Sequence, residues 1–172
     1  MKAIEWINEL MAKLSALVLG LMTLLILVEI LLWNVFSKST MIADEYSAYG
    51  LAGLIFLGAG YTLKEKGHIR ITLVLNLLPE KVARVVEFIA GVVATLFLGY
   101  ITFQLYRMTA SAFRYGSTSG TLTDTPLWIP QAVVVLGAAV FTLQMAAETL
   151  KLLPAVAGKA GPSIFVEGGE GE

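Results

Sequence analysis

Residues 44–70 read DEYSAYGLAGLIFLGAGYTLKEKGHIR, and this stretch decides the fold. It opens with two acids, Asp44 and Glu45, crosses about twenty mostly apolar and glycine-rich residues, and ends in a basic turn. At a rise of 1.5 Å per residue, an apolar helix of that length matches the ~30 Å hydrocarbon thickness of a bilayer. The charges at its two ends differ in sign and therefore also favour one orientation. The stretch predicts a transmembrane helix over residues 44–63.

The composition of the whole chain indicates the same class of protein. Of its 172 residues, 57% are hydrophobic and 15% are charged, and the mean hydropathy is +0.78. A soluble domain carries about a quarter charged residues, and it does not gather its apolar residues into such long runs. The net charge of −1 gives no sign of a nucleic-acid partner, and the absence of cysteine excludes disulfides and thiolate metal sites. We expect an all-α integral membrane protein surrounded by the lipid bilayer.

Three further apolar runs are long enough to cross a membrane. With residues 44–63 they predict a four-helix membrane domain over residues 14–153, whose other spans are residues 14–36, 82–106 and 126–153. Thr125 is the expected N-cap of the last span, because Pro126 suits the first helical position. Four spans place both termini on the same side of the membrane.

Shorter segments flank and join these spans. Residues 1–13 have charges of both signs and a helical set of apolar residues, which predicts a short amphipathic helix on the membrane surface. A cleaved signal peptide is the alternative, and we reject it because the next apolar run is too long and no small-x-small site follows. Residues 71–79 are too short to span and predict an interfacial segment between the second and third spans. The glycine-rich, acidic residues 154–172 predict a flexible tail.

Glu29 is an acid inside the first predicted span. An acid at that depth costs roughly 2.5–3.5 kcal/mol on insertion scales, so its side chain should face protein or water. An ion or proton relay is one interpretation. A position near enough to the interface to be solvated is another. We favour a polar contact with another helix, because the chain has no second intramembrane acid or base to complete a relay.

A glycine-containing face runs along the second predicted span. Tyr49, Gly53, Phe56 and Gly60 follow i, i+4, i+7, i+11 spacing and so share one side of a helix. Glycines on such a face allow another helix backbone to approach closely. The face predicts a helix contact, either within this chain or with a different subunit.

The basic residues predict the orientation of the chain. Nine of the twelve Lys and Arg residues lie on the side of the termini, against Lys38, Arg107 and Arg114 on the other side. Because basic residues concentrate in cytoplasmic segments, both termini are expected in the cytoplasm. The candidate residues of the opposite, outer face are Asp44, Glu45 and Arg114.

The turn after the second span is then also cytoplasmic. Its candidate functional residues are Lys66, His68 and Arg70, which would fix the turn against lipid headgroups or another subunit. His68 is the only histidine, and a pH switch is one interpretation of it. We favour a polar residue that shapes a surface turn beside Gly67.

The sequence offers no residues for catalysis or for a cofactor. A four-helix haem protein needs axial ligands such as histidine pairs, and a thiol oxidase needs cysteines. No Ser-His-Asp set, metal cluster, phosphate loop or internal repeat is visible in the sequence. We therefore expect a protein that is not an enzyme and binds no cofactor, whose polar and glycine-containing faces meet a partner.

An ordered set of short motifs resembles the small membrane subunit of TRAP transporters, the tripartite ATP-independent periplasmic family. The motifs are WNVFSKS at 33–39, DE at 44–45, FLGAGY at 56–61, KGHIR at 66–70, LP at 78–79 and PLW at 126–128. Each motif is weak singly, but their order and the four-span plan agree from about residue 14 to about residue 153.

The resemblance implies a function in transport across the bacterial cytoplasmic (inner) membrane. In such systems a periplasmic substrate-binding protein captures an organic anion, often a carboxylate. A large membrane subunit carries the substrate and sodium sites. The small subunit is implied to brace the large one as a scaffold and to offer part of the periplasmic docking surface.

A free-standing four-span membrane adaptor or a homo-oligomeric small channel is the alternative function. A pore of that kind needs a polar stripe along one helix, and no span has a continuous one. A membrane enzyme ranks third because the catalytic groups are missing.

Overall fold

The computed structural model describes residues 2–65 and 79–153. They form four helices, α1 (Lys2–Phe36), α2 (Ala43–Lys64), α4 (Glu80–Tyr115) and α5 (Trp128–Lys151), and no strand is present among the described residues. The predicted all-α class is confirmed. Three predicted features lie outside the described residues: the basic turn with Lys66, His68 and Arg70, the interfacial segment, and the tail from residue 154.

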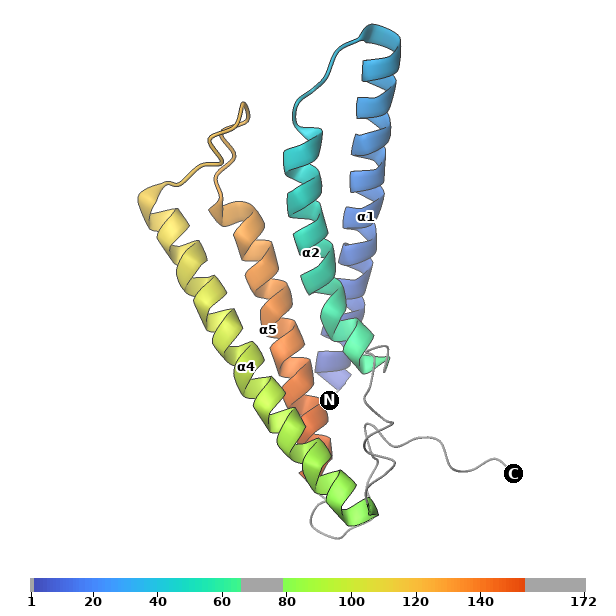
Figure 1. Cartoon of the computed structure of the whole chain (residues 1–172), viewed down its shortest axis with the longest axis vertical. Coiled ribbons are helices and arrows are strands. Elements are labelled where there is room, and N and C mark those ends of the chain that lie inside the picture. Colours follow the sequence, from blue (N-terminus) through green and yellow to red (C-terminus); the bar gives the residue numbers. More distant parts are fainter. Residues whose placement is uncertain (1, 66–78, 154–172) are drawn as a thin grey trace, which may run out of the picture.

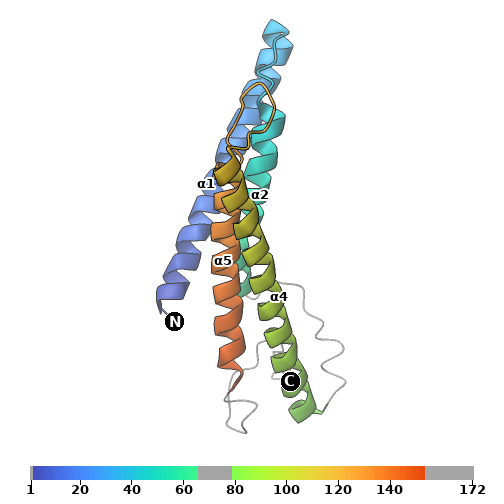
Figure 2. The ribbon, with the colours of Figure 1, turned by 90° about the vertical axis from the view of Figure 1, so that its left-hand side faces the viewer.

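The four helices form a single twisted layer rather than a closed bundle (Figures 1 and 2). The spatial order is α1, α2, α5, α4, so that α2 and α5 lie in the middle and α1 and α4 form the two edges. α1 also touches α5 over a shorter stretch. Successive helices run in opposite directions, which puts the start of α1, the end of α2, the start of α4 and the end of α5 at the same end of the layer.

Three of these helices are long and apolar enough to cross a membrane, over Ile4–Phe36, Val82–Tyr115 and Trp128–Lys151. α2 has 22 residues, includes several glycines and tyrosines, and is not among these three helices. It is also the helix enclosed between α1 and α5. A helix covered by protein on two sides presents little surface to lipid, so it can cross a membrane with fewer large apolar side chains.

Several predicted boundaries differ from the structure. α1 begins at Lys2 and continues to Phe36, so residues 2–13 are its first turns and not a separate surface helix. The reason is that Asn8 and Met11 of these turns are buried, as is Ser15 in the next turn. Tertiary contacts therefore stabilise a continuous helix across residue 13. The helix predicted over 82–106 extends to Tyr115 and ends at Gly116, whose φ of 60° is left-handed and suits a helix end.

The last helix begins later than predicted. Its N-cap is Leu127 and not Thr125, and no side chain caps it. Pro126 instead forms an isolated antiparallel bridge with Thr118. The Thr125 hydroxyl is already used, because it lies 2.9 Å from the Thr123 hydroxyl and 3.3 Å from the Tyr46 hydroxyl. Hydrogen bonds within the loop before α5 and to the start of α2 therefore replace a side-chain cap.

Small residues bring the two central helices close together. A Cβ atom added to Gly137 of α5 would lie 2.5 Å from the carbonyl carbon of Phe56 and 2.8 Å from the amide nitrogen of Leu57, both backbone atoms of α2. Such close approach of backbones allows van der Waals packing to hold helices together in lipid. On the other side of α5, the hydroxyls of Thr142 and Thr102 lie 3.0 Å apart across the contact with α4.

Candidate functional site

Polar clusters lie at both ends of the helical layer, with the Gly137 crossing between them. The first cluster, which we call the amide cluster, consists of Asn8, Gln144, Glu148 and Lys151. It joins α1 to α5 near the end of the layer where α1 begins and α5 ends. The second, which we call the hydroxyl cluster, consists of Glu45 and the hydroxyl groups of Tyr49, Thr121 and Thr123, and it lies at the other end of the layer.

In the amide cluster, the Asn8 side-chain amide donates hydrogen bonds to the Ile4 carbonyl at 2.9 Å and to Gln144 Oε1 at 2.7 Å. The Gln144 amide then donates to Glu148 Oε1 at 2.8 Å, and the Lys151 ammonium lies 2.6 Å from the same oxygen. Asn8 is 0% exposed and Gln144 is 2% exposed. A buried polar chain of this kind fixes the register of the helices that it joins, because an unpaired amide in an apolar setting is costly.

Gly60 of α2 closes the amide cluster from the third side. A Cβ atom at Gly60 would collide with Asn8 Oδ1 and would lie 3.5 Å from Val140 of α5. Asn8 Oδ1 is buried without a hydrogen-bond donor among the described residues. The glycine is therefore needed here to let α1, α2 and α5 meet at one point.

The hydroxyl cluster ties the start of α2 to the loop between α4 and α5. Glu45 accepts hydrogen bonds from the Thr121 hydroxyl, from the Thr123 hydroxyl at 2.8 Å and from the Tyr49 hydroxyl at 2.9 Å. The loop hydroxyls also contact one another, with Ser119 and Thr121 2.7 Å apart. One carboxylate thus organises a loop that has no regular secondary structure beyond a single bridge.

Glu29 makes a third polar contact, with the loop that follows its own helix. Its carboxylate accepts hydrogen bonds from the hydroxyls of Ser39 and Thr40 and from the Thr40 amide at 3.1 Å. The contact expected with another helix is therefore replaced by a contact with the α1–α2 loop. The physical reason is proximity, because Glu29 lies two turns before the end of α1 and the loop folds back over it.

The predicted glycine face of α2 packs mainly against α5 and α1, and its Tyr49 end belongs to the hydroxyl cluster. Gly53 and Gly60 are buried against α5 and α1 of the same chain, which is the first of the two alternatives that the sequence left open. Phe56 contributes its backbone to the Gly137 crossing. Tyr49 is half-buried and bonds to Glu45.

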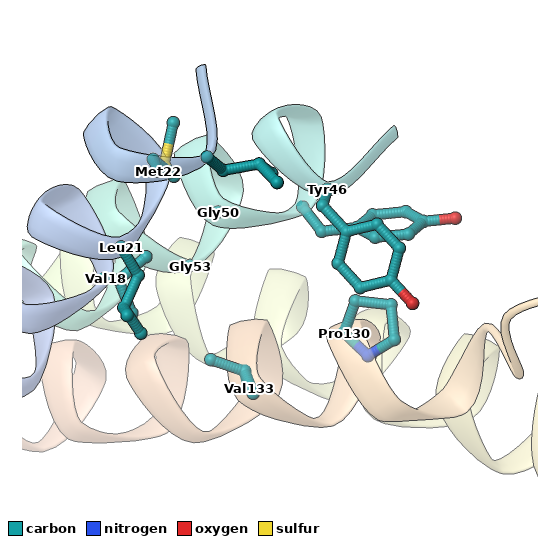
Figure 3. A pocket seen from close by; sticks show the side chains of 10 residues that line it. Val18, Leu21, Met22, Tyr46, Gly50, Gly53, Pro130 and Val133 are labelled. Carbon is teal, nitrogen blue, oxygen red and sulfur yellow. The ribbon is translucent and has the colours of Figure 1, made fainter. Parts of the chain in front are cut away.

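Between Gly53 and the start of α2, an open apolar groove of about 270 Å³ lies between α1 and α5 (Figure 3). Val18, Leu21 and Met22 of α1 form one wall, Pro130 and Val133 of α5 form the other, and Gly50 and Gly53 of α2 form the floor. Tyr46 and Tyr49 close its end beside the hydroxyl cluster. The groove has room for an apolar side chain or chain segment from outside the protein.

The remaining outer-face residues are exposed. Asp44 is exposed in the first turn of α2, and Arg114 is exposed in the last turn of α4. They lie at the same end of the layer as the α1–α2 loop. Glu45, in contrast, is half-buried and occupied by the loop hydroxyls.

Sequence reasoning did not find the amide cluster. Residues 1–13 were expected on the membrane surface, where a polar side chain faces water and does not indicate a buried contact. The signal that could have found Asn8 is its place on the helical set Ile4, Asn8, Met11 and Ser15, which interrupts an apolar face with an amide. Gln144 is likewise an amide that interrupts an apolar run.

Comparison with known proteins identifies the family of the chain. The family model described as "Tripartite ATP-independent periplasmic transporters, DctQ component" matches residues 22–155. Two Haemophilus influenzae proteins, provisionally described as TRAP transporter small permease proteins, are similar to the chain. No solved structure matches it.

The first relative is 31% identical over 85 residues, which cover 49% of this chain and 53% of that protein. The second is 25% identical over 112 residues, which cover 63% of this chain and 68% of that protein. The chain thus spans about half the length of the first relative and about two thirds of the second. Components of this family belong to transporters and are not enzymes. Since the family model covers most of the helical layer, the chain belongs to the DctQ family and is a small membrane subunit of the TRAP transporter type.

Proposed function

We propose that this chain is a fixed scaffold that braces the large membrane subunit of a TRAP transporter. The transporter would import an organic anion, of the carboxylate class, with sodium as the coupling ion. A periplasmic binding protein would deliver the anion. The observation that carries the scaffold role is the single helical layer, joined by polar clusters at both ends and apolar on its exposed faces.

The layer has the properties that a brace requires. The Gly137 crossing packs α2 directly against α5, the amide cluster joins α1 to α5, and the hydroxyl cluster ties the start of α2 to the loop before α5. A layer one helix thick cannot bury the large apolar side chains on its faces by itself, and many of them are exposed along α1 and α4. Apolar surface of that extent is suited to lipid and to a partner that is itself embedded in the membrane.

A channel formed by copies of this chain is the second candidate, and the polar groups do not favour it. Two polar side chains of the central helix α5 are occupied in contacts within the chain, Gln144 with Asn8 of α1 and Thr142 with Thr102 of α4. A pore needs a continuous polar stripe on an exposed helix face. The exposed faces of α1 and α4 are instead dominated by large apolar residues.

We further propose that both termini are cytoplasmic, in the bacterial inner membrane. The four helix ends at the terminal end of the layer lie on one side, and most Lys and Arg residues belong to that side. The other end, with Asp44, Arg114 and the hydroxyl-cluster loop, would then face the periplasm and the binding protein. The groove over Gly53 would receive an apolar side chain of the large subunit, and Tyr49 would line that contact.

Copurification tests the scaffold role. The tagged chain is extracted from membranes in mild detergent together with the coexpressed large subunit. Recovery of the two in a fixed ratio, and uptake of carboxylates in vesicles only with a sodium gradient and all three components, would support the proposal. Recovery of this chain alone as a defined oligomer would contradict it and favour the channel.

A variant in the groove tests where the large subunit binds. Val133→Phe adds a ring to the groove wall and should reduce recovery of the large subunit. Leu136→Phe is the matched control, because Leu136 is exposed on the same helix and does not line the groove. Equal recovery with both variants would place the contact on another face of the layer.

A further inference from the structure

A second hollow lies on the outer side of α4, at the end of that helix near the α4–α5 loop. It has a volume of about 270 Å³, and its lining comes from successive turns of this one helix. The lining residues are Tyr106, Arg107, Ala110, Ser111, Arg114 and Tyr115. Arg107, Ser111 and Arg114 follow i, i+4, i+7 spacing, which places two guanidinium groups and a hydroxyl on the same face. We call this hollow the arginine groove.

Both arginines of the groove are available to an anion. Arg107 lies over the Phe103 ring, with its guanidinium carbon 5.9 Å from the ring centre. Within the described parts of the chain, neither Arg107 nor Arg114 forms an ion pair. Two neighbouring unpaired guanidinium groups repel each other, and an anion placed between them removes that repulsion.

The position of the groove along α4 matches the membrane interface. The 25 helical residues from 82 to 106 already span about 37 Å, which exceeds the ~30 Å of the hydrocarbon layer even with a moderate tilt. The groove therefore begins where lipid headgroups begin. Tyr106 and Tyr115 are 60% and 77% exposed, as expected for aromatic residues that lie at the interface.

An apolar aromatic path leads from the groove toward the membrane centre. Tyr100 and Phe103 are exposed on the turns that precede the groove, and Phe97 is exposed one turn before them. This path is suited to acyl chains. An acidic protein surface would match the charge of the groove but would leave the adjoining aromatic path uncovered.

We infer that the arginine groove binds an anionic phospholipid. Arg107 and Arg114 would hold the headgroup phosphate, Ser111 would donate a hydrogen bond to it, and the acyl chains would follow Phe103 and Tyr100. Guanidinium groups suit phosphate because they donate two parallel hydrogen bonds to it. The inference requires that α4 crosses the membrane and does not depend on the proposed orientation or on the scaffold role.

The test uses the full chain, with the large subunit where the two copurify, in nanodiscs of mixed phosphatidylglycerol and phosphatidylcholine. Retention of phosphatidylglycerol is measured by native mass spectrometry for Arg107→Gln, Arg114→Gln and the double variant. We expect about a fivefold loss for each arginine and roughly 25-fold for the pair. Lys38→Gln is the matched control, because Lys38 is an exposed cation at the same end of the layer and outside the groove.

If Lys38→Gln loses as much phosphatidylglycerol as the arginine variants, general surface charge would explain the retention, and the inference would be overturned. Unchanged retention would overturn it as well. Loss of binding-protein attachment with unchanged lipid retention would assign the arginines to an acidic protein partner instead.

A measurement on the unmodified chain covers the case in which a variant does not fold. Photoactivatable phosphatidylglycerol is crosslinked to the chain in membranes, and the adducts are mapped by peptide mass spectrometry. Adducts concentrated within residues 100–115 support the site. Adducts spread over all exposed helix faces overturn it.

Discussion

Adding one methyl group at Gly137 should separate the two central helices. A Cβ at this position would lie 2.5 Å from the Phe56 carbonyl carbon, 2.7 Å from the carbonyl oxygen and 2.8 Å from the Leu57 amide nitrogen. These are backbone atoms of α2, so no side-chain rotation can remove the overlap. Carbon atoms pack best at about 3.5–4.0 Å, so α5 must move away from α2 by roughly 1 Å.

The cost of Gly137→Ala follows from that displacement. Overpacking of a well-packed contact costs typically about 1–3 kcal/mol. The displacement would also stretch the Asn8–Gln144 hydrogen bond, because Gln144 lies two turns further along α5 and Asn8 belongs to α1, which packs on α2. We therefore expect the variant to lose about 1–3 kcal/mol of unfolding free energy, measured by SDS titration in mixed micelles with far-UV circular dichroism.

Gly53→Ala is the matched control for this measurement. The same substitution is made in the same helix contact, but a Cβ at Gly53 would meet only the Val133 side chain, at an ordinary 3.5 Å. Any general effect of replacing glycine by alanine in a helix is shared by both variants, so their difference reports the backbone overlap. Equal stability of the two variants would refute the close α2–α5 crossing and the rigid layer that depends on it.

Three further variants test the polar clusters. Asn8→Ala leaves the buried Gln144 carbonyl without its donor and should cost about 0.5–2 kcal/mol in the same titration, whereas no change would mean that water replaces the amide. Glu29→Gln removes the charge that holds the α1–α2 loop, and the Thr40 amide should exchange its hydrogen about tenfold faster, a change that mass spectrometry or NMR detects. Glu45→Ala should make the α4–α5 loop more susceptible to limited proteolysis while the helical content stays constant, and an unchanged cleavage rate would show that the loop hydroxyls hold it alone.

Much of the architecture followed from the sequence because it depends on properties of single segments. Length and hydropathy identify a membrane helix without knowledge of its neighbours, so the all-α class and the four helical segments were predictable. The end of α4 lies beyond the span predicted over residues 82–106, because the more polar residues 107–115 continue the helix past the apolar run to Gly116. The motif order also identified the family, which the match over residues 22–155 confirmed.

The tertiary structure alone decided which helices are neighbours and which polar groups are buried. α5 lies between α2 and α4 because Gly137 fits the backbone at Phe56, and this fit joins residues some eighty positions apart. The same holds for Asn8 with Gln144 and for Glu45 with the loop threonines. Hydropathy records how much a segment avoids water, and it contains no information about the shape or hydrogen-bonding groups of a distant partner, which are what fix helix packing within lipid.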